Sequence, residues 1–217
     1  MLYVPGCNRR YLEKAKTLRV DSVILDLGDP ILIDAKDESR NNVVDFLEQN
    51  AYGKREVVVR VNDFDSPWGT NDIKAVAKLN ADAILFPNIE SRDDVLIAID
   101  ALDKAGGKDT PVMVMIESPK AVLHAEEIAS ASERIACMIL ATSDLISQLH
   151  ARTTQSRIAG LHSLSAAMVA ARAYGVGLVD GSPRNLKDTA PLYYGCALVM
   201  GRGCAVKTLG APVTLAD

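Results

Sequence analysis

Residues 112–119 read Val-Met-Val-Met-Ile-Glu-Ser-Pro, and this stretch indicates the class of fold. Val112–Ile116 is a continuous apolar run without alternation, which is typical of a parallel strand that is covered on both faces. Ser118 followed by Pro119 is a typical helix start, because the serine can cap the helix and proline fits its first turn. The stretch therefore predicts a buried strand that leads directly into a helix.

The same strand-and-helix unit recurs along the chain. Seven further short apolar runs predict strands over Leu2–Val4, Ser22–Leu27, Glu56–Val61, Ala83–Phe86, Cys137–Ala141, Gly177–Asp180 and Cys204–Leu209. The stretches between them predict helices over Tyr11–Val20, Ala35–Gln49, Pro67–Leu79, Arg92–Ala105, Lys120–Ser132, Asp144–Leu149, Leu161–Tyr174 and Leu186–Met200. This alternation favours an α/β fold of the (β/α)8 TIM barrel class, and we expect a single domain over residues 1–217.

Two further features bear on this fold class. An open dinucleotide-binding sheet needs Gly-x-Gly-x-x-Gly after its first strand, whereas residues 4–9 read Val-Pro-Gly-Cys-Asn-Arg. The chain has 217 residues, and about 250 are typical of a TIM barrel. Because the shortfall comes after the eighth strand, we expect the barrel to lack its final helix and a C-terminal lid.

The charge balance excludes several classes of partner. Lys and Arg together number 24 and Asp and Glu 28, which gives a net charge of −4. No basic excess is available to neutralise the phosphates of nucleic acid or of an anionic membrane surface. The apolar runs are too short to span a bilayer, and the N-terminus lacks the pattern of a signal peptide. We therefore expect a cytoplasmic protein that binds neither nucleic acid nor membrane.

Two acidic residues follow consecutive predicted strands, at the barrel end where chemistry is usually found. They are Glu117 and Asp144. Adjacent strands lie about 4.8 Å apart, so the two carboxylates would repel each other unless a cation or a proton lay between them. Mg²⁺ commonly takes one or two protein carboxylates and completes its shell with water and substrate oxygens. The alternative is that Asp144 caps the helix that follows it.

An arginine lies at the end of the third predicted strand. Arg60 ends a run that is mostly valine, and its planar guanidinium suits a substrate carboxylate or a thioester-linked acid. The alternative role is an ion pair with Asp26 or Asp29, which end the neighbouring second strand. These roles are compatible, because such a pair can position the arginine. Either aspartate could alternatively serve as a base or organise a water molecule.

Several motifs resemble, in order, those of the citrate lyase β-subunit-like enzymes of the HpcH/HpaI aldolase/citrate lyase family. The similarity covers nearly the whole chain, and the order of the motifs makes it specific. The motifs are Leu2-Tyr-Val-Pro-Gly with Asn8-Arg9, Val23-Ile-Leu-Asp26-Leu, Val59-Arg60-Val-Asn62 with Ser66-Pro-Trp-Gly69, Met115-Ile-Glu117-Ser-Pro119, Ala141-Thr-Ser-Asp144-Leu, Val179-Asp180-Gly181 and Lys207-Thr208-Leu209.

The resemblance implies a Mg²⁺-dependent carbon–carbon lyase. The expected substrate is a 3-hydroxy-acyl thioester of CoA or of acyl carrier protein, such as a citryl, malyl or citramalyl thioester. Its cleavage gives an acyl thioester and an oxo acid of the oxaloacetate, pyruvate or glyoxylate type. The resemblance also implies a homotrimer or hexamer. By the resemblance, Glu117 and Asp144 bind the metal, Arg60 holds the acid oxygens of the substrate, and Asn8 and Arg9 lie where relatives bind the nucleotide end of CoA. The candidate catalytic residues are thus Arg60, Asp26 and Asp29, and Pro119 joins Arg60, Asn8 and Arg9 as a candidate for substrate binding.

The chain departs from the family pattern at three places. After the seventh strand relatives usually read Gly-Val-Tyr, whereas residues 181–183 here are Gly-Ser-Pro. Relatives read Leu-Asp-Leu-Glu-Asp at the second strand, whereas Gly28 stands here in place of the glutamate. The C-terminal segment that supplies a catalytic aspartate to a neighbouring subunit in malyl-CoA lyase-like members has no counterpart. Two alternatives therefore remain open: a pyruvate-class aldolase acting on free hydroxy-oxo acids, and a catalytically impaired homologue that binds CoA or an oxo acid.

Overall fold

The structure is a computed structural model that describes residues 1–152, 154, 157–181, 206–208 and 210. The chain divides into two compact units, and each is described by itself. The first comprises residues 1–87 and 97–112, and the second comprises residues 88–96 and the chain from residue 113 onward. None of the helices in the described ranges combines the length and apolar character needed to cross a bilayer.

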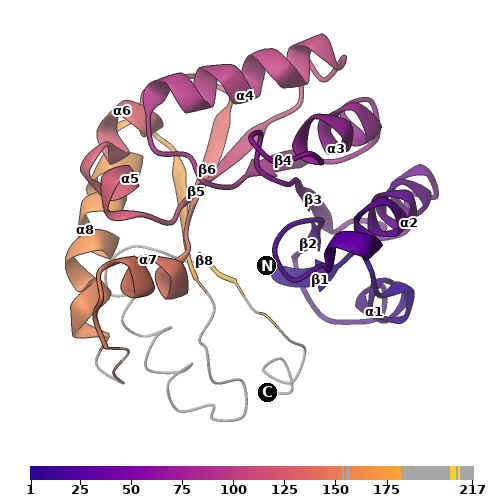
Figure 1. Cartoon of the computed structure of the whole chain (residues 1–217), viewed down its shortest axis with the longest axis horizontal. Coiled ribbons are helices and arrows are strands. Elements are labelled where there is room, and N and C mark those ends of the chain that lie inside the picture. Colours follow the sequence, from indigo (N-terminus) through magenta and orange to yellow (C-terminus); the bar gives the residue numbers. More distant parts are fainter. Residues whose placement is uncertain (153, 155–156, 182–205, 209, 211–217) are drawn as a thin grey trace. The chain divides into compact units, whose positions relative to one another are not determined.

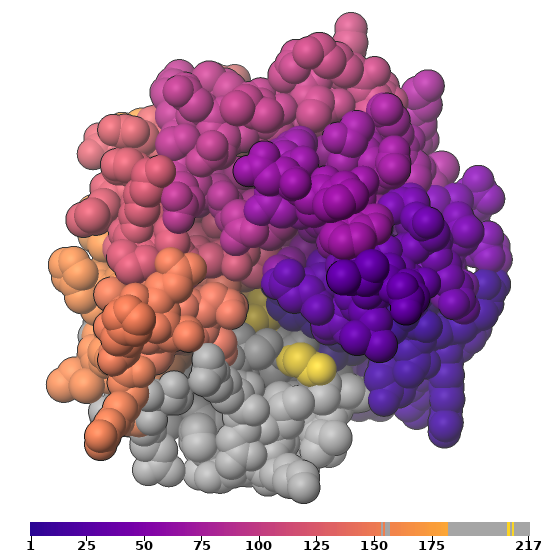
Figure 2. All heavy atoms as spheres, in the orientation of Figure 1, coloured from indigo at the N-terminus to yellow at the C-terminus, as the bar shows by residue number. Residues whose placement is uncertain are grey.

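The first unit contains four strands in sequence order, each hydrogen-bonded in parallel to the next. Figure 1 shows helices α1, α2 and α3 along the outer side of these strands. Figure 2 shows that side chains (indigo to violet) fill the spaces between these ribbons. The elements of the first unit are β1 (Leu2–Pro5), α1 (Arg9–Ala15), β2 (Ser22–Asp26), η1 (Ile33–Ala35), α2 (Lys36–Glu48), β3 (Glu56–Arg60), α3 (Gly69–Val76), β4 (Ala83–Phe86) and most of α4 (Arg92–Lys104).

The second unit continues the same alternation of strands and helices. Strand β6 pairs in parallel with β7, and β7 pairs in parallel with β8. A hydrogen bond from the amide of Ala141 to the carbonyl of Ile116, 3.0 Å long, joins the segment after β6 to the end of β5. The elements of the second unit are β5 (Val112–Ile116), α5 (Pro119–Leu123), α6 (Ala125–Ala129), β6 (Ile135–Leu140), α7 (Thr142–Gln148), α8 (Ile158–Ala173), β7 (Gly177–Asp180) and β8 (Val206–Lys207).

The apolar runs of the sequence form the core as predicted. Every residue of β2, β4 and β5 is buried. Burial on both faces explains why these strands read as continuous apolar runs rather than as alternating ones. All eight predicted strands are present, although for the last one only Val206–Lys207 is a strand within the described residues.

Several predicted helix boundaries were wrong. Helix α3 begins at Gly69, two residues after the predicted Pro67, although the Ser66 hydroxyl does accept the amide hydrogens of Trp68 and Gly69. The predicted helix over Lys120–Ser132 is two helices that meet at His124. Helix α8 begins three residues before the predicted Leu161. The predicted helix over Leu186–Met200 lies outside the described residues.

Candidate functional site

Two predicted catalytic residues lie side by side at the ends of β2 and β3. The strand register pairs Asp26 with Arg60, and both residues are buried. Arg60 Nη1 lies 3.5 Å from Asp26 Oδ2, and Arg60 Nη2 donates to Asp29 Oδ2 over 2.9 Å. The Asp29 side chain is 89% exposed, whereas that of Asp26 is 4% exposed. The predicted counter-ion role of both aspartates is therefore confirmed, and only Asp29 faces solvent.

Burial raises the pKa of the Asp26 carboxyl above its ordinary value. The positive charge of Arg60 opposes this rise, as does the amide of Gly28, which donates to Asp26 Oδ1 over 2.8 Å. The exposed Asp29 adds a negative charge that raises the pKa further. Asp26 is therefore the buried partner of the guanidinium, and Asp29 is the exposed one.

Gly28 lies against this ion pair. A β-carbon placed on Gly28 would lie 3.1 Å from Arg60 Cζ and 3.1 Å from Asp26 Oδ1. Such contacts are shorter than normal van der Waals separations, so the pair would have to move to admit any side chain. Arg60 can therefore occupy its observed position because residue 28 has no side chain.

Sequence reasoning missed Lys36, which holds the turn that follows β2. Its ammonium group donates to the carbonyls of Leu27 (2.9 Å) and Gly28 (2.7 Å) and to Asn62 Oδ1 (2.6 Å). Lys36 is 6% exposed, and burial lowers its pKa below the ordinary value of 10.5. The first residue of α2 thereby fixes the backbone from which Asp29 projects.

Sequence reasoning also missed the hydrogen bonds that link Asn62 to Asp72 and extend those of Lys36. Asn62 Nδ2 donates to the Leu27 carbonyl (2.7 Å) and to Asp72 Oδ2 (2.6 Å), and its backbone amide donates to the same carboxylate oxygen (3.0 Å). Asp72 also accepts a 2.7 Å bond from Arg40 Nε and is 1% exposed. Only Asn62 stood in a recognised motif, and nothing in the sequence pattern linked it to Lys36 or Asp72.

The structure gives Asn8 and Arg9 structural partners. Asn8 is the N-cap of α1, and its side chain accepts the amide hydrogen of Tyr11. Arg9 Nη1 donates to Asn42 Oδ1 and Asp45 Oδ2, each over 3.0 Å, and about half of the Arg9 side chain is exposed. Both residues thus lie at the start of α1, and their predicted role in binding CoA stays a prediction.

In the second unit, Glu117 directly follows β5. It is 6% exposed, and its Oε1 accepts a 3.4 Å bond from the amide of Asn88. The cap of the next helix is Ser118, whose hydroxyl oxygen accepts the amide hydrogen of Ala121, and Pro119 occupies the first turn. The capping predicted for Ser118 is confirmed, and Glu117 is not needed for it.

Asp144 lies in the first turn of α7 and is exposed. The predicted alternative, that Asp144 caps this helix, is wrong, because the N-cap is Ala141 and no side chain makes the capping bond. Helix α7 begins two residues earlier than predicted, which places Asp144 inside the helix rather than at its boundary.

These two carboxylates fit a hard divalent cation. Both carry carboxylate oxygens, neither caps a helix, and the Ala141–Ile116 hydrogen bond joins the segments that carry them. Across the described ranges, no three His, Cys, Asp or Glu side chains form a group that could hold a metal ion. An ion bound by Glu117 and Asp144 would therefore take further ligands from water and substrate, which is the usual behaviour of Mg²⁺.

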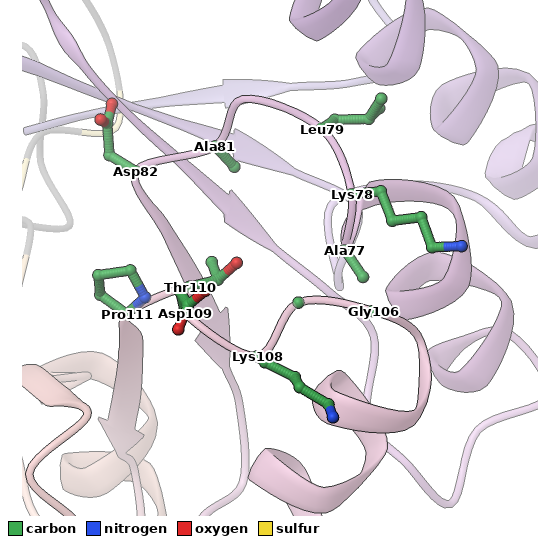
Figure 3. Close-up of a pocket in the computed structure, with 11 residues that line it drawn as sticks. Ala77, Lys78, Leu79, Ala81, Asp82, Gly106, Lys108, Asp109, Thr110 and Pro111 are labelled. Carbon is green, nitrogen blue, oxygen red and sulfur yellow. The ribbon is translucent and has the colours of Figure 1, made fainter.

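A hollow of about 560 Å³ lies at the other end of the strands of the first unit. Figure 3 shows its walls, which come from the loops that precede β4 and β5 and carry Lys78, Asp82 and Lys108. None of the predicted site residues lines it. The amino ends of barrel strands contribute to stability rather than to chemistry, so this hollow is not the candidate site.

Comparison with protein families relates this geometry to known proteins. The family model described as HpcH/HpaI aldolase/citrate lyase matches residues 1–212. A (3S)-malyl-CoA thioesterase from Cereibacter sphaeroides is 37% identical over 215 residues, which are 99% of this chain and 73% of the relative. A citrate lyase subunit beta from Haemophilus influenzae is 32% identical over 218 residues, covering 98% of this chain and 75% of the relative.

Solved structures show the same fold. The citrate lyase beta subunit from Mycobacterium tuberculosis, complexed with oxaloacetate and magnesium, matches with a TM-score of 0.81 and 23% identity over 99% of this chain and 92% of that chain. RipC from Yersinia pestis matches with a TM-score of 0.82 and 21% identity over 99% of this chain and 90% of that chain. These matches confirm the predicted fold class.

Proposed function

The chain belongs to the HpcH/HpaI aldolase/citrate lyase family, and from that premise we propose that it is a Mg²⁺-dependent carbon–carbon lyase. Its substrate is a 3-hydroxy-acyl thioester of the citryl, malyl or citramalyl type, carried by CoA or acyl carrier protein. The observation that carries this proposal is the buried Arg60 at the end of β3, held between Asp26 and the exposed Asp29.

The ligands of solved relatives support the substrate class. One structure of the M. tuberculosis citrate lyase beta subunit contains oxaloacetate and magnesium. Another structure, of the protein CitE from M. tuberculosis, contains magnesium, acetoacetate and coenzyme A. An oxo acid and a CoA thioester are the two products that the proposed cleavage releases.

Arg60 has the chemistry to bind the acid end of the substrate. A guanidinium carries five N–H donors in one plane, so it can donate to a substrate carboxylate while two aspartates hold it in place. Fixing one end of the substrate orients the bond that breaks, and such orientation accounts for a large part of the rate of many enzymes. Asp26 and the turn held by Lys36 keep Arg60 and Asp29 in their observed positions.

The proposed cleavage begins with removal of the proton from the 3-hydroxyl group. Asp29 is the group assigned to accept it, directly or through a water molecule, because its carboxylate is exposed beside Arg60. The oxygen then forms a carbonyl, and the bond between C2 and C3 breaks. The electron pair passes to the thioester as an enolate, which takes up a proton at C2 to give the acyl thioester.

Glu117 and Asp144 are the residues that would hold Mg²⁺. When bound, the ion would chelate the oxygens of the oxo acid and stabilise negative charge on them. Glu117 is buried and Asp144 is exposed, so one ligand is fixed in the core of its unit and the other faces solvent. Water and substrate oxygens would complete the Mg²⁺ shell from the exposed side, where Asp144 lies.

The test is a panel of citramalyl-, malyl- and citryl-CoA incubated with the protein and Mg²⁺, with the oxo acid measured as its phenylhydrazone. Arg60→Met should lower kcat/KM about 100-fold or more, and the exposed Arg92→Met serves as the matched control. Absence of turnover on the panel, together with absence of oxo-acid binding, refutes the proposal.

Turnover of free hydroxy-oxo acids alone would identify a pyruvate-class aldolase, and a thermal shift with CoA without turnover would identify an impaired homologue.

Thioester hydrolysis is a second candidate, favoured by the 37% identity to a (3S)-malyl-CoA thioesterase. The two reactions differ in the bond that breaks. The lyase breaks a carbon–carbon bond in malyl-CoA and gives acetyl-CoA and glyoxylate, whereas the thioesterase breaks the carbon–sulfur bond and gives malate and free CoA. A thiol reagent detects only the free CoA, so measuring thiol and glyoxylate in the same sample distinguishes the two reactions.

A further inference from the structure

A buried ion pair lies at the carboxyl end of β7, and the proposed function does not use it. Asp180 ends this strand and is fully buried. Arg157 forms two parallel bonds with it, Nη1 to Oδ2 over 2.7 Å and Nη2 to Oδ1 over 2.6 Å. Two parallel N–H···O bonds fix the relative orientation of the guanidinium and the carboxylate more strictly than one bond can.

The first residue of α7 joins this pair. The hydroxyl of Thr142 donates to Asp180 Oδ1 over 3.2 Å, and its oxygen accepts a 3.3 Å bond from Arg157 Nη2. Gly181 makes this approach possible, because a β-carbon placed on Gly181 would lie 2.6 Å from the Leu140 carbonyl oxygen and 3.0 Å from the Thr142 amide nitrogen. The end of β7 is therefore packed directly against the start of α7.

Arg157 combines these bonds with a strained backbone conformation. Its φ is 54° and its ψ is 22°, in the left-handed region that residues other than glycine rarely adopt. Such strain persists only where surrounding contacts enforce it, and it clusters at functional sites. The side chain of Arg157 is held by its two bonds to Asp180 and its bond to Thr142.

The anchored helix carries a proposed metal ligand. Asp144 lies two residues after Thr142 in the first turn of α7, and no side chain caps this helix. The contacts of Thr142 with Asp180 and Arg157 thus tie the start of the helix to the end of β7. A shift of the first turn would move Asp144 with it.

We infer that Arg157, Asp180 and Thr142 position Asp144 for Mg²⁺, as positioning residues that act through the start of α7. This inference rests on the proposed function, because it takes Asp144 as a metal ligand. Residues that orient a metal ligand without touching the ion typically change metal affinity 10- to 100-fold when they are altered. The same range is expected for loss of the Thr142 hydroxyl.

The experiment measures binding of Mn²⁺ by electron paramagnetic resonance, with Mg²⁺ as competitor, on the full chain without substrate. Thr142→Val keeps the shape of the side chain and removes the hydroxyl, so it should weaken Mg²⁺ binding about 10-fold or more. Thr142→Ser keeps the hydroxyl and should bind Mg²⁺ within about 2-fold of the original protein. Thr17→Val, an exposed threonine in the other unit, is the control. Thermal unfolding is followed in parallel, because a purely structural role would lower Tm without changing metal affinity.

The outcomes separate this inference from the proposed function. Equal Mg²⁺ affinity of Thr142→Val and the original protein, with Asp144→Asn losing the metal, would overturn the positioning role alone. Failure of the original protein to bind Mn²⁺, or unchanged binding by Asp144→Asn, would overturn the metal assignment and the positioning role together. Arg157→Met provides a second variant, and if it does not fold, the comparison of Thr142→Val with Thr142→Ser decides.

Discussion

Replacing Lys36 with methionine is the sharpest test of how the candidate site is held together. Methionine has a similar length and keeps the apolar stem, but it cannot donate a hydrogen bond. The substitution removes three bonds that converge on the end of β2, to the carbonyls of Leu27 and Gly28 and to the side chain of Asn62. The variant Lys36→Met therefore isolates the contribution of the ammonium group.

The expected loss of stability follows from what each former partner retains. The Leu27 carbonyl keeps its 2.7 Å bond from Asn62, and the Gly28 carbonyl keeps a 3.2 Å bond from the amide of Ile31. Charge-assisted bonds contribute about 1.5–3 kcal/mol each, but removing a buried charge also removes the cost of its desolvation, which the lowered pKa of Lys36 reflects. We therefore expect a loss of about 2–4 kcal/mol, well below the sum of three such bonds.

Urea denaturation at pH 7, followed by circular dichroism, measures this loss. The matched control is Lys104→Met, because Lys104 is 75% exposed and pairs with Asp100 one turn away on α4. That surface pair is expected to contribute about 0.5 kcal/mol or less. Equal unfolding midpoints for the two variants, with unchanged m-values, would refute the reasoning that Lys36 holds the turn before Asp29.

Three further predictions concern the same elements. Gly28→Ala should lower the free energy of unfolding by about 1–3 kcal/mol, because the new methyl group must displace Arg60; a stable variant with unchanged substrate affinity would contradict this. The raised pKa of Asp26 means that the folded protein binds more protons than the unfolded chain above pH 3.8. The stability of the original protein relative to Asp26→Asn should therefore fall as pH rises from 3.8 through the folded pKa, and parallel pH profiles would disprove it. Ser118→Ala should cost about 1 kcal/mol in thermal unfolding by leaving the Ala121 amide without its cap, whereas Ser118→Asp should retain most of the stability.

Much of the fold could be predicted, because strands and helices are specified by local patterns. The continuous apolar run Val112–Ile116 is a buried strand, and the Ser118-Pro119 pair begins a helix as predicted. Helix boundaries were less predictable where a tertiary or turn contact competes with the local pattern. The Ser66 hydroxyl, for example, accepts the amide hydrogen of Gly69 as a cap would, but residues 67–68 form a turn and the helix begins only at Gly69.

The candidate site was predictable only in part. The positions of Asp26 and Arg60 at adjacent strand ends follow from the order of the strands, and the register of β2 with β3 confirms it. Lys36 escaped prediction because a lysine at the start of a helix ordinarily points to solvent. Arg157 escaped because it lies in a polar stretch with no periodic pattern, far in sequence from its partner Asp180.

By itself the sequence determined the alternation of strands and helices, the family, and the polar residues that follow each strand. Apolar periodicity and short motifs are local properties, so they can be recognised without knowing which segments meet. The tertiary structure decided the partners of the buried polar groups: Lys36 with the turn after β2, and Arg157 with Asp180 and Thr142. The physical reason is that a buried charge must be paired where it lies in space, and the partner can come from any part of the chain.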